Sequence, residues 1–531
     1  MSSKSPLELP PVARQLAFNL STDTLYACIR VSKSWHDLFL PYLWRTILVG
    51  IGCADTSLRE AWADCRWHGP YPENAHYHRH LVQRFTLIGE PCGVERIQFP
   101  ILRNMVLQPI FRKSGPRMMV LLDFLTMCPV LRRLEMKDVH MTPQAWRTLS
   151  THPHLKSLAL ENVQIVAGDA PVFWQICMQL ETLEMDNVTF GGGAGSGGSQ
   201  EGGIVPKDKV FDRIRTFSLR RGYEQFERQP TELIHCLPGV ESMTLASDLP
   251  TQWMEYPIQN HWPHIKSLVL TGVQEPTLAA ILESVGHGLA SLTFYHCELA
   301  TRANSKRALQ AHFKTLVELR IHPCTPVSSD TVLDVLCSCP VLEVLHVRYL
   351  SAEVITERGP WACQHYLREL TAGIQVGQNE EALQPLVFER LSTLTRLEML
   401  EILTPMPNSR RSMLAFRLEC GLGQLAHWQH LSVLQFSMEW YNINTPQVGM
   451  YEVAWMAKHW KKLRSVSGHL HHDMEMELQL RIMFESHGIK TFPSSSSLGE
   501  SSSSSLILFS PPLPMNQYRT GRRRRNDQLG I

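Results

Sequence analysis

A short pattern of apolar residues recurs through the middle of this chain and constrains its fold more than any other feature. Four segments carry an apolar residue at positions 1, 4, 6, 9 and 11: LRRLEMKDVHM from Leu131, LKSLALENVQI from Leu155, LETLEMDNVTF from Leu180 and LASLTFYHCEL from Leu289. Weaker copies of the first six positions begin at Val82, Leu102, Ile214, Val240, Ile265, Leu316, Leu342, Leu367, Leu397, Leu431 and Leu463. The step from one copy to the next is typically about 25 residues, which indicates a repeat architecture.

The pattern matches the leucine-rich-repeat template L-x-x-L-x-L-x-x-N/C-x-L, with Val or Cys at the ninth position. The sequence between copies looks helical: in TPQAWRTLS, Thr142 can cap a helix that begins at Pro143. A short strand and a helix, stacked many times, predict an α/β fold. We expect a curved, right-handed leucine-rich-repeat solenoid with a parallel sheet on its concave side.

Composition changes along the chain predict four regions. Residues 1–47 form a helical module, 48–80 a linker or N-terminal cap, and 81–490 the solenoid. A Gly/Ser-rich insertion at 191–203 predicts an exposed loop inside the solenoid. The repeat steps lengthen after Leu367, so the last repeats should be irregular, and the Ser-rich and Arg-rich residues 491–531 predict a disordered tail.

Bulk properties exclude several classes of protein. The 531 residues are 44% hydrophobic and carry a formal net charge of +1, which gives no general attraction to nucleic acid or to an anionic membrane. No apolar run approaches the roughly 20 residues that span a bilayer. We also find no signal peptide, so we expect a chain of the cytoplasm and/or nucleus that does not contact membranes.

The thirteen cysteines fit the repeat. Cys128, Cys177 and Cys339 each lie three residues before the first leucine of a copy, and Cys297 and Cys324 occupy the ninth position. We therefore predict small buried side chains rather than metal ligands, and we expect no metal and no cofactor.

Motifs for catalysis are missing from the sequence. There is no P-loop, HExxH, GxSxG or dinucleotide fingerprint, so we do not expect an enzyme. The clusters HYHRH and HLHHD bring no cysteine or well-spaced carboxylate for a metal. The run GRRRR near the C-terminus is compatible with a nuclear-localisation signal, a nucleic-acid contact or a plain solubilising tail.

The first 47 residues do not follow the repeat and predict three helices. Leu16 and Leu20 lie on the first, Leu25 on the second, and Trp35 and Phe39 on the third. About forty residues is too few to bury a core of its own. The module must therefore complete its burial against the solenoid, where we expect Trp44 to pack, or against a partner.

The spacing of the apolar residues in this module resembles an F-box. The positions that carry the resemblance are Leu9, Pro10, Leu20, Leu25, Val31 and Trp35. The following FLPYLWRTI is similar to the segment after the F-box in fungal F-box proteins with leucine-rich repeats. One departure is that Pro11-Val12-Ala13 replaces the usual acidic-apolar start of the first helix.

The resemblance implies a substrate-recognition subunit of an SCF-type ubiquitin ligase. Those six positions would bind a Skp-family adaptor, which would join the chain to cullin and RING subunits and lead a protein substrate to proteasomal degradation. One alternative is that Val31 and Trp35 only close the module. Another is an interaction scaffold without ubiquitin machinery. A third is an RNA- or chromatin-associated protein, which is suggested only by the arginine run.

The substrate would lie on the concave face of the sheet. In each copy, positions 4 and 6 should point into the core and positions 3, 5 and 7 toward the concave surface. The candidate substrate-binding residues at these outward positions are Glu135, Glu161, Glu184, Asp186, Tyr295, Arg320, His322, His346 and Arg348. They predict an acidic N-terminal half and a basic, His-containing C-terminal half; a solvated sheet face with incidental charges is the alternative.

Overall fold

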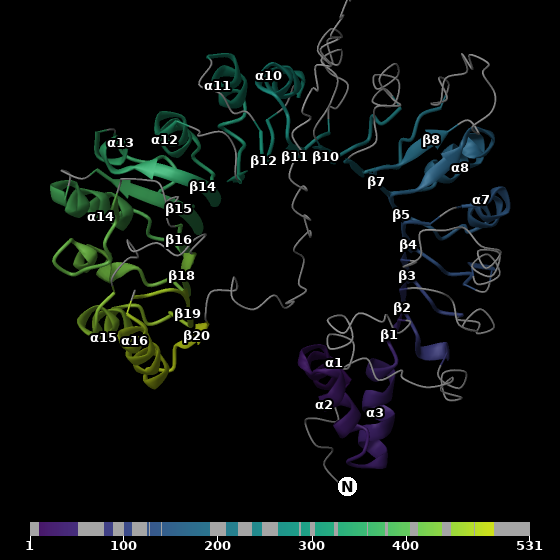
Figure 1. Cartoon of the computed structure of the whole chain (residues 1–531), viewed down its shortest axis with the longest axis horizontal. Helices are drawn as coiled ribbons and strands as arrows, with labels where there is room; N and C mark the ends of the chain where they lie inside the picture. Colours follow the sequence, from purple (N-terminus) through teal and green to yellow (C-terminus); the bar gives the residue numbers. More distant parts are fainter. Residues whose placement is uncertain are drawn as a thin grey trace, which may run out of the picture.

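The computed structural model describes a long curved sheet preceded by three helices. The described residues are 10–50, 79–88, 100–108, 125–126, 128–139, 141–191, 209–220, 236–246, 264–285, 288–297, 303–322, 328–357, 359–377, 381–403, 412–437, 448–471 and 473–492. Within them, an eighteen-stranded sheet lines the inner side of an open arc and helices line its outer side (Figure 1). The predicted loop at 191–203, apart from Gly191, and the predicted tail, apart from residues 491–492, lie outside the described residues.

Each predicted copy of the repeat contains a strand that starts two residues after the copy's first apolar residue. In chain order these strands are β2 (Arg84–Ile88), β3 (Asn104–Gln108), β4 (Arg133–Lys137), β5 (Ser157–Glu161), β7 (Thr182–Asp186), β9 (Thr216–Leu219), β10 (Ser242–Ala246), β11 (Ser267–Thr271), β12 (Ser291–Tyr295), β13 (Glu318–Ile321), β14 (Val344–Ser351), β15 (Glu369–Val376), β16 (Met399–Leu403), β18 (Val433–Ser437) and β19 (Ser465–Gly468). Each pairs in parallel with the next, which confirms the repeat and the parallel sheet.

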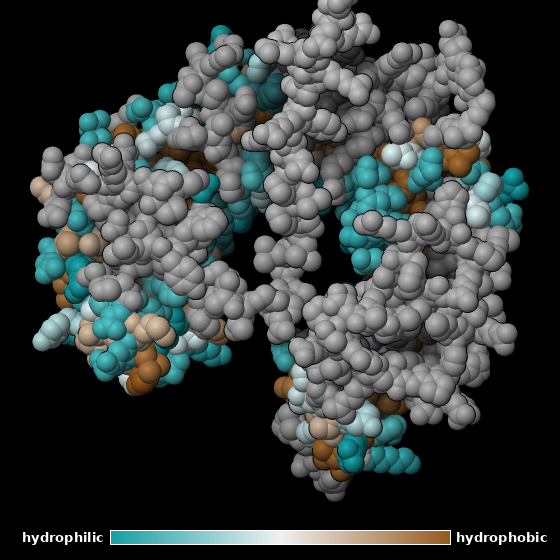
Figure 2. Space-filling model, in the orientation of Figure 1, coloured by the Kyte–Doolittle hydropathy of each residue, from teal (hydrophilic) through white to brown (hydrophobic). Residues whose placement is uncertain are grey.

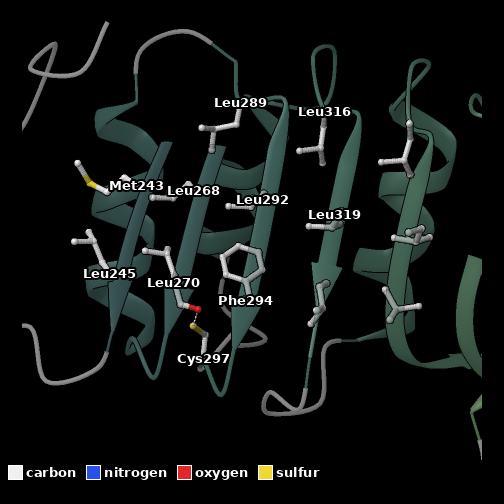
Figure 3. Close-up of a cluster of buried hydrophobic side chains, with 14 of the residues drawn as sticks. Met243, Leu245, Leu268, Leu270, Leu289, Leu292, Phe294, Cys297, Leu316 and Leu319 are labelled. Carbon is white, nitrogen blue, oxygen red and sulfur yellow. Dashed lines mark hydrogen bonds between the residues drawn. The ribbon is translucent and has the colours of Figure 1, made fainter. Parts of the chain in front are cut away.

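Apolar side chains at positions 4 and 6 point away from the concave surface and form the core. Leu268 is in register with Met243 on one side and with Leu292 on the other. Leu268, Leu270 and Leu292 are fully buried (Figure 3). Because burying one leucine contributes about 1.5–3 kcal/mol, stacking of equivalent positions stabilises the whole array.

The sheet is longer at both ends than the repeat predicts. Strand β1 (Thr46–Gly50) pairs with β2, and β20 (Lys490–Phe492) pairs with β19. The sheet therefore begins at Thr46, and its first strand reaches into the region 48–80 that the sequence assigns to a linker or N-terminal cap. The periodicity did not reveal β1 because the spacing from Trp44 to Val82 is much longer than the usual step.

Helices cover the convex side. Their bounds are α7 (Pro143–Ser150), α8 (Ala170–Cys177), α10 (Glu275–Ser284), α11 (Ala303–Gln310), α12 (Ser329–Ser338), α13 (Ala352–Glu357), α14 (Gln384–Ser392), α15 (Met450–His459) and α16 (Met474–Ser486). As predicted, α7 begins at Pro143, and the Thr142 hydroxyl accepts a hydrogen bond from the Ala145 N–H at 3.3 Å. The helix buries Ala145, Trp146 and Leu149 against the core.

Short elements interrupt this regular order. Strands β6 (Gln164–Val166) and β8 (Thr189–Gly191) form a separate two-stranded sheet, and 3₁₀ helices occupy Arg79–Leu81, Ala167–Asp169, Glu381–Leu383 and Leu422–His427. Strand β17 (Ser412–Met413) pairs antiparallel with β15. The predicted irregularity after Leu367 is thereby confirmed.

A left-handed residue at position 8 turns the chain out of strands β4, β5, β7 and β12. Asp138, Asn162, Asn187 and His296 have φ between 52° and 54°. The Asn162 amide donates to the Asp138 carboxylate at 2.9 Å, and the Asn187 amide donates to Asn162 at 2.8 Å. Asn and Asp tolerate this conformation better than most other L-residues do, which explains why three of these four positions carry Asn or Asp.

The cysteines of the repeat are buried as predicted. Cys128, Cys177, Cys297 and Cys339 have no exposed surface, and Cys324 lies outside the described residues. The Cys297 thiol donates to the Leu270 carbonyl at 3.4 Å (Figure 3). Burial raises the pKa of Cys128 and of Cys339 to about 12, which keeps both as unreactive thiols.

Three helices precede the sheet, as the sequence predicts: α1 (Pro10–Asn19), α2 (Thr22–Cys28) and α3 (Lys33–Leu43). Ser21 and Ser32 cap the second and the third. Trp44 follows α3 and packs against the core of the solenoid, as expected. None of the helices in the described residues is long and apolar enough to cross a membrane.

Candidate functional site

Two surfaces are candidates for binding: the outer face of the helical module and the concave face of the sheet. In the module, Ala17, Leu25 and Phe39 form a small core, and the Trp35 ring lies 5.4 Å from the ring of Phe39. Leu20 packs against this core with part of its surface exposed.

The predicted adaptor contacts divide into exposed and buried residues. Val31 is 65% exposed, and Leu20 and Trp35 are half-buried. Leu25 is only 7% exposed, so its prediction as a surface contact is corrected: α2 turns this side chain into the module. Leu9 lies outside the described residues, and Pro10 begins α1.

Tyr26 was missed by the sequence analysis. Its side chain is 48% exposed, and the Arg30 guanidinium lies 6.0 Å from the centre of its ring. We call Leu20, Tyr26, Val31 and Trp35 the module face. In the lower part of Figure 2, hydrophobic residues of the module appear at the surface among polar ones.

Outward side chains of the concave face follow the predicted register. In β4, Leu134 and Met136 are buried while Arg133, Glu135 and Lys137 keep exposed surface. The same alternation recurs in β7 and β11. Positions 3, 5 and 7 therefore form the concave surface, as expected.

The acidic residues of the N-terminal half are paired with cations on the same or neighbouring strands. Lys137 Nζ lies 2.7 Å from the Glu161 carboxylate. Arg133 Nη2 lies 3.8 Å from Glu135 and 3.9 Å from Glu184. Asp186 occupies the last position of β7, and its backbone carbonyl accepts from the Asn162 N–H. The half is a mixed-charge surface rather than the predicted acidic one.

The C-terminal half brings together several of the predicted residues. The rings of Tyr295 and His322 stack at 4.3 Å with an interplanar angle of 4°. Arg320 Nη1 lies 3.1 Å from His346 Nδ1, and the His346 ring lies edge-on to His322 with 6.4 Å between centroids. Arg348, also predicted here, places its guanidinium 5.4 Å from the ring centre of Tyr349.

Carboxylates neutralise the cation in this group. Arg320 forms an ion pair with Glu318 on the same strand, and its Nη2 lies 3.7 Å from Glu369 on β15. The Ser291 hydroxyl donates to Glu318 at 3.0 Å. We call Tyr295, Glu318, Arg320, His322, His346 and Glu369 the concave cluster.

Burial keeps the histidines of the concave cluster neutral. Burial, with Arg320 and His322 nearby, lowers the pKa of His346 to about 4. Burial and the charge of Arg320 also lower the pKa of His322. For Glu318, burial acts to raise the pKa, but hydrogen bonds and charge from Arg320 outweigh it and the pKa is lowered. The concave cluster is therefore polar and aromatic. The C-terminal half of the concave face is not basic here, in contrast to the prediction from the sequence.

Two further acidic residues were missed. Glu369 and Glu401 occupy outward positions of β15 and β16, and the Thr371 hydroxyl donates to Glu401 at 3.0 Å. Gln435 of β18 donates to the same carboxylate at 3.1 Å. Continuing the register to the last strands would have identified these residues.

No group of histidine, cysteine or carboxylate side chains in the described residues could hold a metal ion. Of the HLHHD cluster, His469 contacts the Glu477 carboxylate, with Nδ1 at 3.6 Å.

Comparisons with known proteins find no matching family model and no matching curated protein. Two of the solved structures that are similar to this chain are the following. The TLR13–ssRNA13 complex is 13% identical over 73% of this chain, which spans 50% of that chain, with a TM-score of 0.33. The Rad7 and Elc1 complex from yeast is 12% identical over 93% of this chain and 100% of that chain, with a TM-score of 0.37. The assignment of a leucine-rich-repeat solenoid rests on the strands and repeats of the chain itself.

Proposed function

We propose that the chain is the substrate-recognition subunit of an SCF-type ubiquitin ligase. The helical module, acting as an F-box, would dock a Skp-family adaptor and through it the cullin and RING subunits. The solenoid would hold a protein substrate for ubiquitination and proteasomal degradation. The observation that carries the proposal is the module face, where Val31 remains 65% exposed although the module's own core is closed.

The junction between module and solenoid supports this role. Helix α3 leads through Trp44 and Arg45 directly into β1. The Arg45 carbonyl accepts hydrogen bonds from the N–H groups of Gln83 and Arg84 at 3.0 and 2.9 Å. A docked adaptor would therefore hold the solenoid in one orientation. The chain would act by proximity, without catalysing the transfer, in the cytoplasm and/or nucleus.

The module face offers apolar and aromatic surface for a contact. Full burial of a side chain such as Val31 contributes about 1.5–3 kcal/mol. Tyr26 and the exposed part of Trp35 add aromatic surface, and aromatic residues are frequent among the side chains that dominate interfaces.

For the substrate we propose the concave cluster. Tyr295 and His322 form a flat aromatic surface beside the carboxylates of Glu318 and Glu369. The aromatic surface can stack on a side chain of a substrate while the flanking polar groups set its orientation.

Co-purification with a recombinant Skp-family adaptor tests the proposal. We expect the full chain to retain the adaptor and Val31→Glu to lose it, because the substitution would bury a charge in the interface. The matched control is Tyr451→Glu on α15, where Tyr451 is 84% exposed and far from the module. Leu25→Glu is unsuitable, since it would place a charge in the core of the module.

The competing function is a protein-interaction scaffold without ubiquitin machinery, which the concave cluster alone would serve. It is favoured if the wild-type chain captures no adaptor. The arginine run that suggests a nucleic-acid role lies outside the described residues.

A further inference from the structure

We propose that the N-terminal ends of the first strands of the sheet, beside the module, bind an acidic polypeptide segment. The surface consists of Arg84, Arg103 and Arg132, which we call the arginine edge. It lies next to the module but uses none of the residues of the module face, so this proposal does not depend on adaptor docking.

A row of side chains lies just before the strands, at position 2 of the repeat. In two stretches of the sheet, from Lys156 to Lys266 and from Glu343 to Glu398, this row alternates in charge. Lys156 Nζ lies 2.5 Å from Glu181, and Lys266 Nζ lies 2.8 Å from Glu241, which also lies 3.9 Å from Arg215. These ion pairs connect neighbouring strands along the edge of the sheet.

The same alternation returns near the other end. Arg368 lies between two carboxylates, with its Nε atom 3.7 Å from Glu343 and 3.9 Å from Glu398. Opposite charges on neighbouring strands stabilise a sheet and like charges destabilise it, so alternation is the favourable arrangement.

The first repeats break this rule. There the row reads Arg45, Gln83, Arg103, Arg132 and Lys156, with no acidic residue. The backbone places these residues on adjacent strands: the Arg103 N–H donates to the Gln83 carbonyl at 3.0 Å, and the Arg132 N–H donates to the Arg103 carbonyl at 2.8 Å. Arg84 follows Gln83 at position 3.

The side chains of the arginine edge are exposed, and no carboxylate within the described part of the chain forms an ion pair with them. Their charges also act on the module junction. Burial, together with the charges of Arg84, Arg14 and Arg103, lowers the pKa of Arg45. The sheet therefore keeps an unfavourable group of like charges where the rest of the row avoids one.

A local cost that the chain avoids elsewhere is the kind of feature expected at a functional site. Guanidinium groups bind carboxylates and phosphates through paired hydrogen bonds. The net charge of the chain is only +1, so it gives no general attraction for an acidic segment, and the attraction must come from a local group of cations such as this one. The acidic groups can come from Asp and Glu or from phosphorylated serine, which share this chemistry.

Fluorescence anisotropy on the full chain tests the proposal with labelled twelve-residue peptides that alternate Ser with Glu, with phosphoserine or with Lys. We expect the Glu or the phosphoserine peptide to bind, with affinity falling several-fold between 50 and 200 mM salt, and the Lys peptide not to bind. The phosphoserine peptide binding more tightly than the Glu peptide would support the proposal and identify the source of the charge.

The variant Arg84→Gln/Arg103→Gln/Arg132→Gln should weaken the binding at least tenfold. The matched control, Arg215→Gln/Arg368→Gln, changes the same row where the arginines are paired, and binding should stay within twofold. Thermal unfolding separates binding from folding. Removing like charges should leave the midpoint of the triple variant equal to or above that of the wild type, and the control midpoint should fall.

Three results would overturn the proposal. They are failure of both acidic peptides to bind, equal affinity of the wild type and the triple variant, and tighter binding of a twelve-nucleotide oligo-dT than of either acidic peptide. The last result would assign the edge to nucleic acid.

Discussion

His346 is the titratable residue whose charge state the concave surface controls most strongly. Only 14% of its side chain is exposed, and Arg320 lies against its ring. The pKa of His346 in the folded chain is lowered to about 4. Between pH 6.5 and 4, His346 is therefore protonated in the unfolded chain but neutral in the folded chain. The stability of the fold should therefore fall as the pH drops from 6.5 toward 4, by about 3 kcal/mol at most.

The variant His346→Gln tests this at the residue scale. Glutamine cannot titrate, so the loss of stability between pH 7 and 5 should be smaller than in the wild type. Chemical denaturation at several pH values in this window measures it, above the range in which Glu318 would titrate. Equal pH dependence of the two proteins would contradict a buried, neutral His346.

Single residues also show where the sequence analysis was sufficient. Leu134 and Met136 could be assigned to the core because a strand alternates its side chains, and the repeat fixed the register. Leu25 could not be assigned, because a helix of seven residues has no repeat to show which face is buried. The pairing of Glu161 with Lys137 depends on contact between strands, which a single repeat does not display.

At the scale of elements, each repeat should respond largely on its own, because a solenoid repeat contacts only its neighbours. Leu183 of β7 is fully buried and lies in register with Leu158 and Phe217. Leu183→Ala should cost about 2–5 kcal/mol of local stability. Hydrogen exchange should accelerate in β5, β7 and β9 and stay unchanged in β18 and β19.

The matched control for this prediction is Thr182→Ala, at a half-exposed position of the same strand. Its exchange should resemble that of the wild type. Uniform acceleration across the sheet in Leu183→Ala would show instead that the array unfolds as one unit.

The elements themselves were predictable to different degrees. Strands of the repeat were found because their spacing recurs, and α7 because Thr142 and Pro143 mark its start. Strand β1 was missed because residues 51–78 separate it from the next copy, and β20 because Lys490–Phe492 carries too few apolar residues to show the pattern.

At the scale of the whole molecule, the module and the solenoid form a sequence of surfaces with separate tasks. The module face lies at one end of the arc, the arginine edge lies at the junction, and the concave cluster lies midway along the sheet (Figure 1). The continuous hydrogen bonds from Arg45 to β2 make the junction part of the sheet. A partner bound to the module would thus hold the concave cluster in a defined position.

Hydrogen exchange of the full chain with and without a recombinant Skp-family adaptor tests the central claim most directly. We predict that the adaptor protects backbone amides in α2 and α3, between Thr22 and Leu43, and leaves the strands β12–β15 of the concave cluster unchanged. No protection at any amide, or protection confined to the concave strands, would contradict the account.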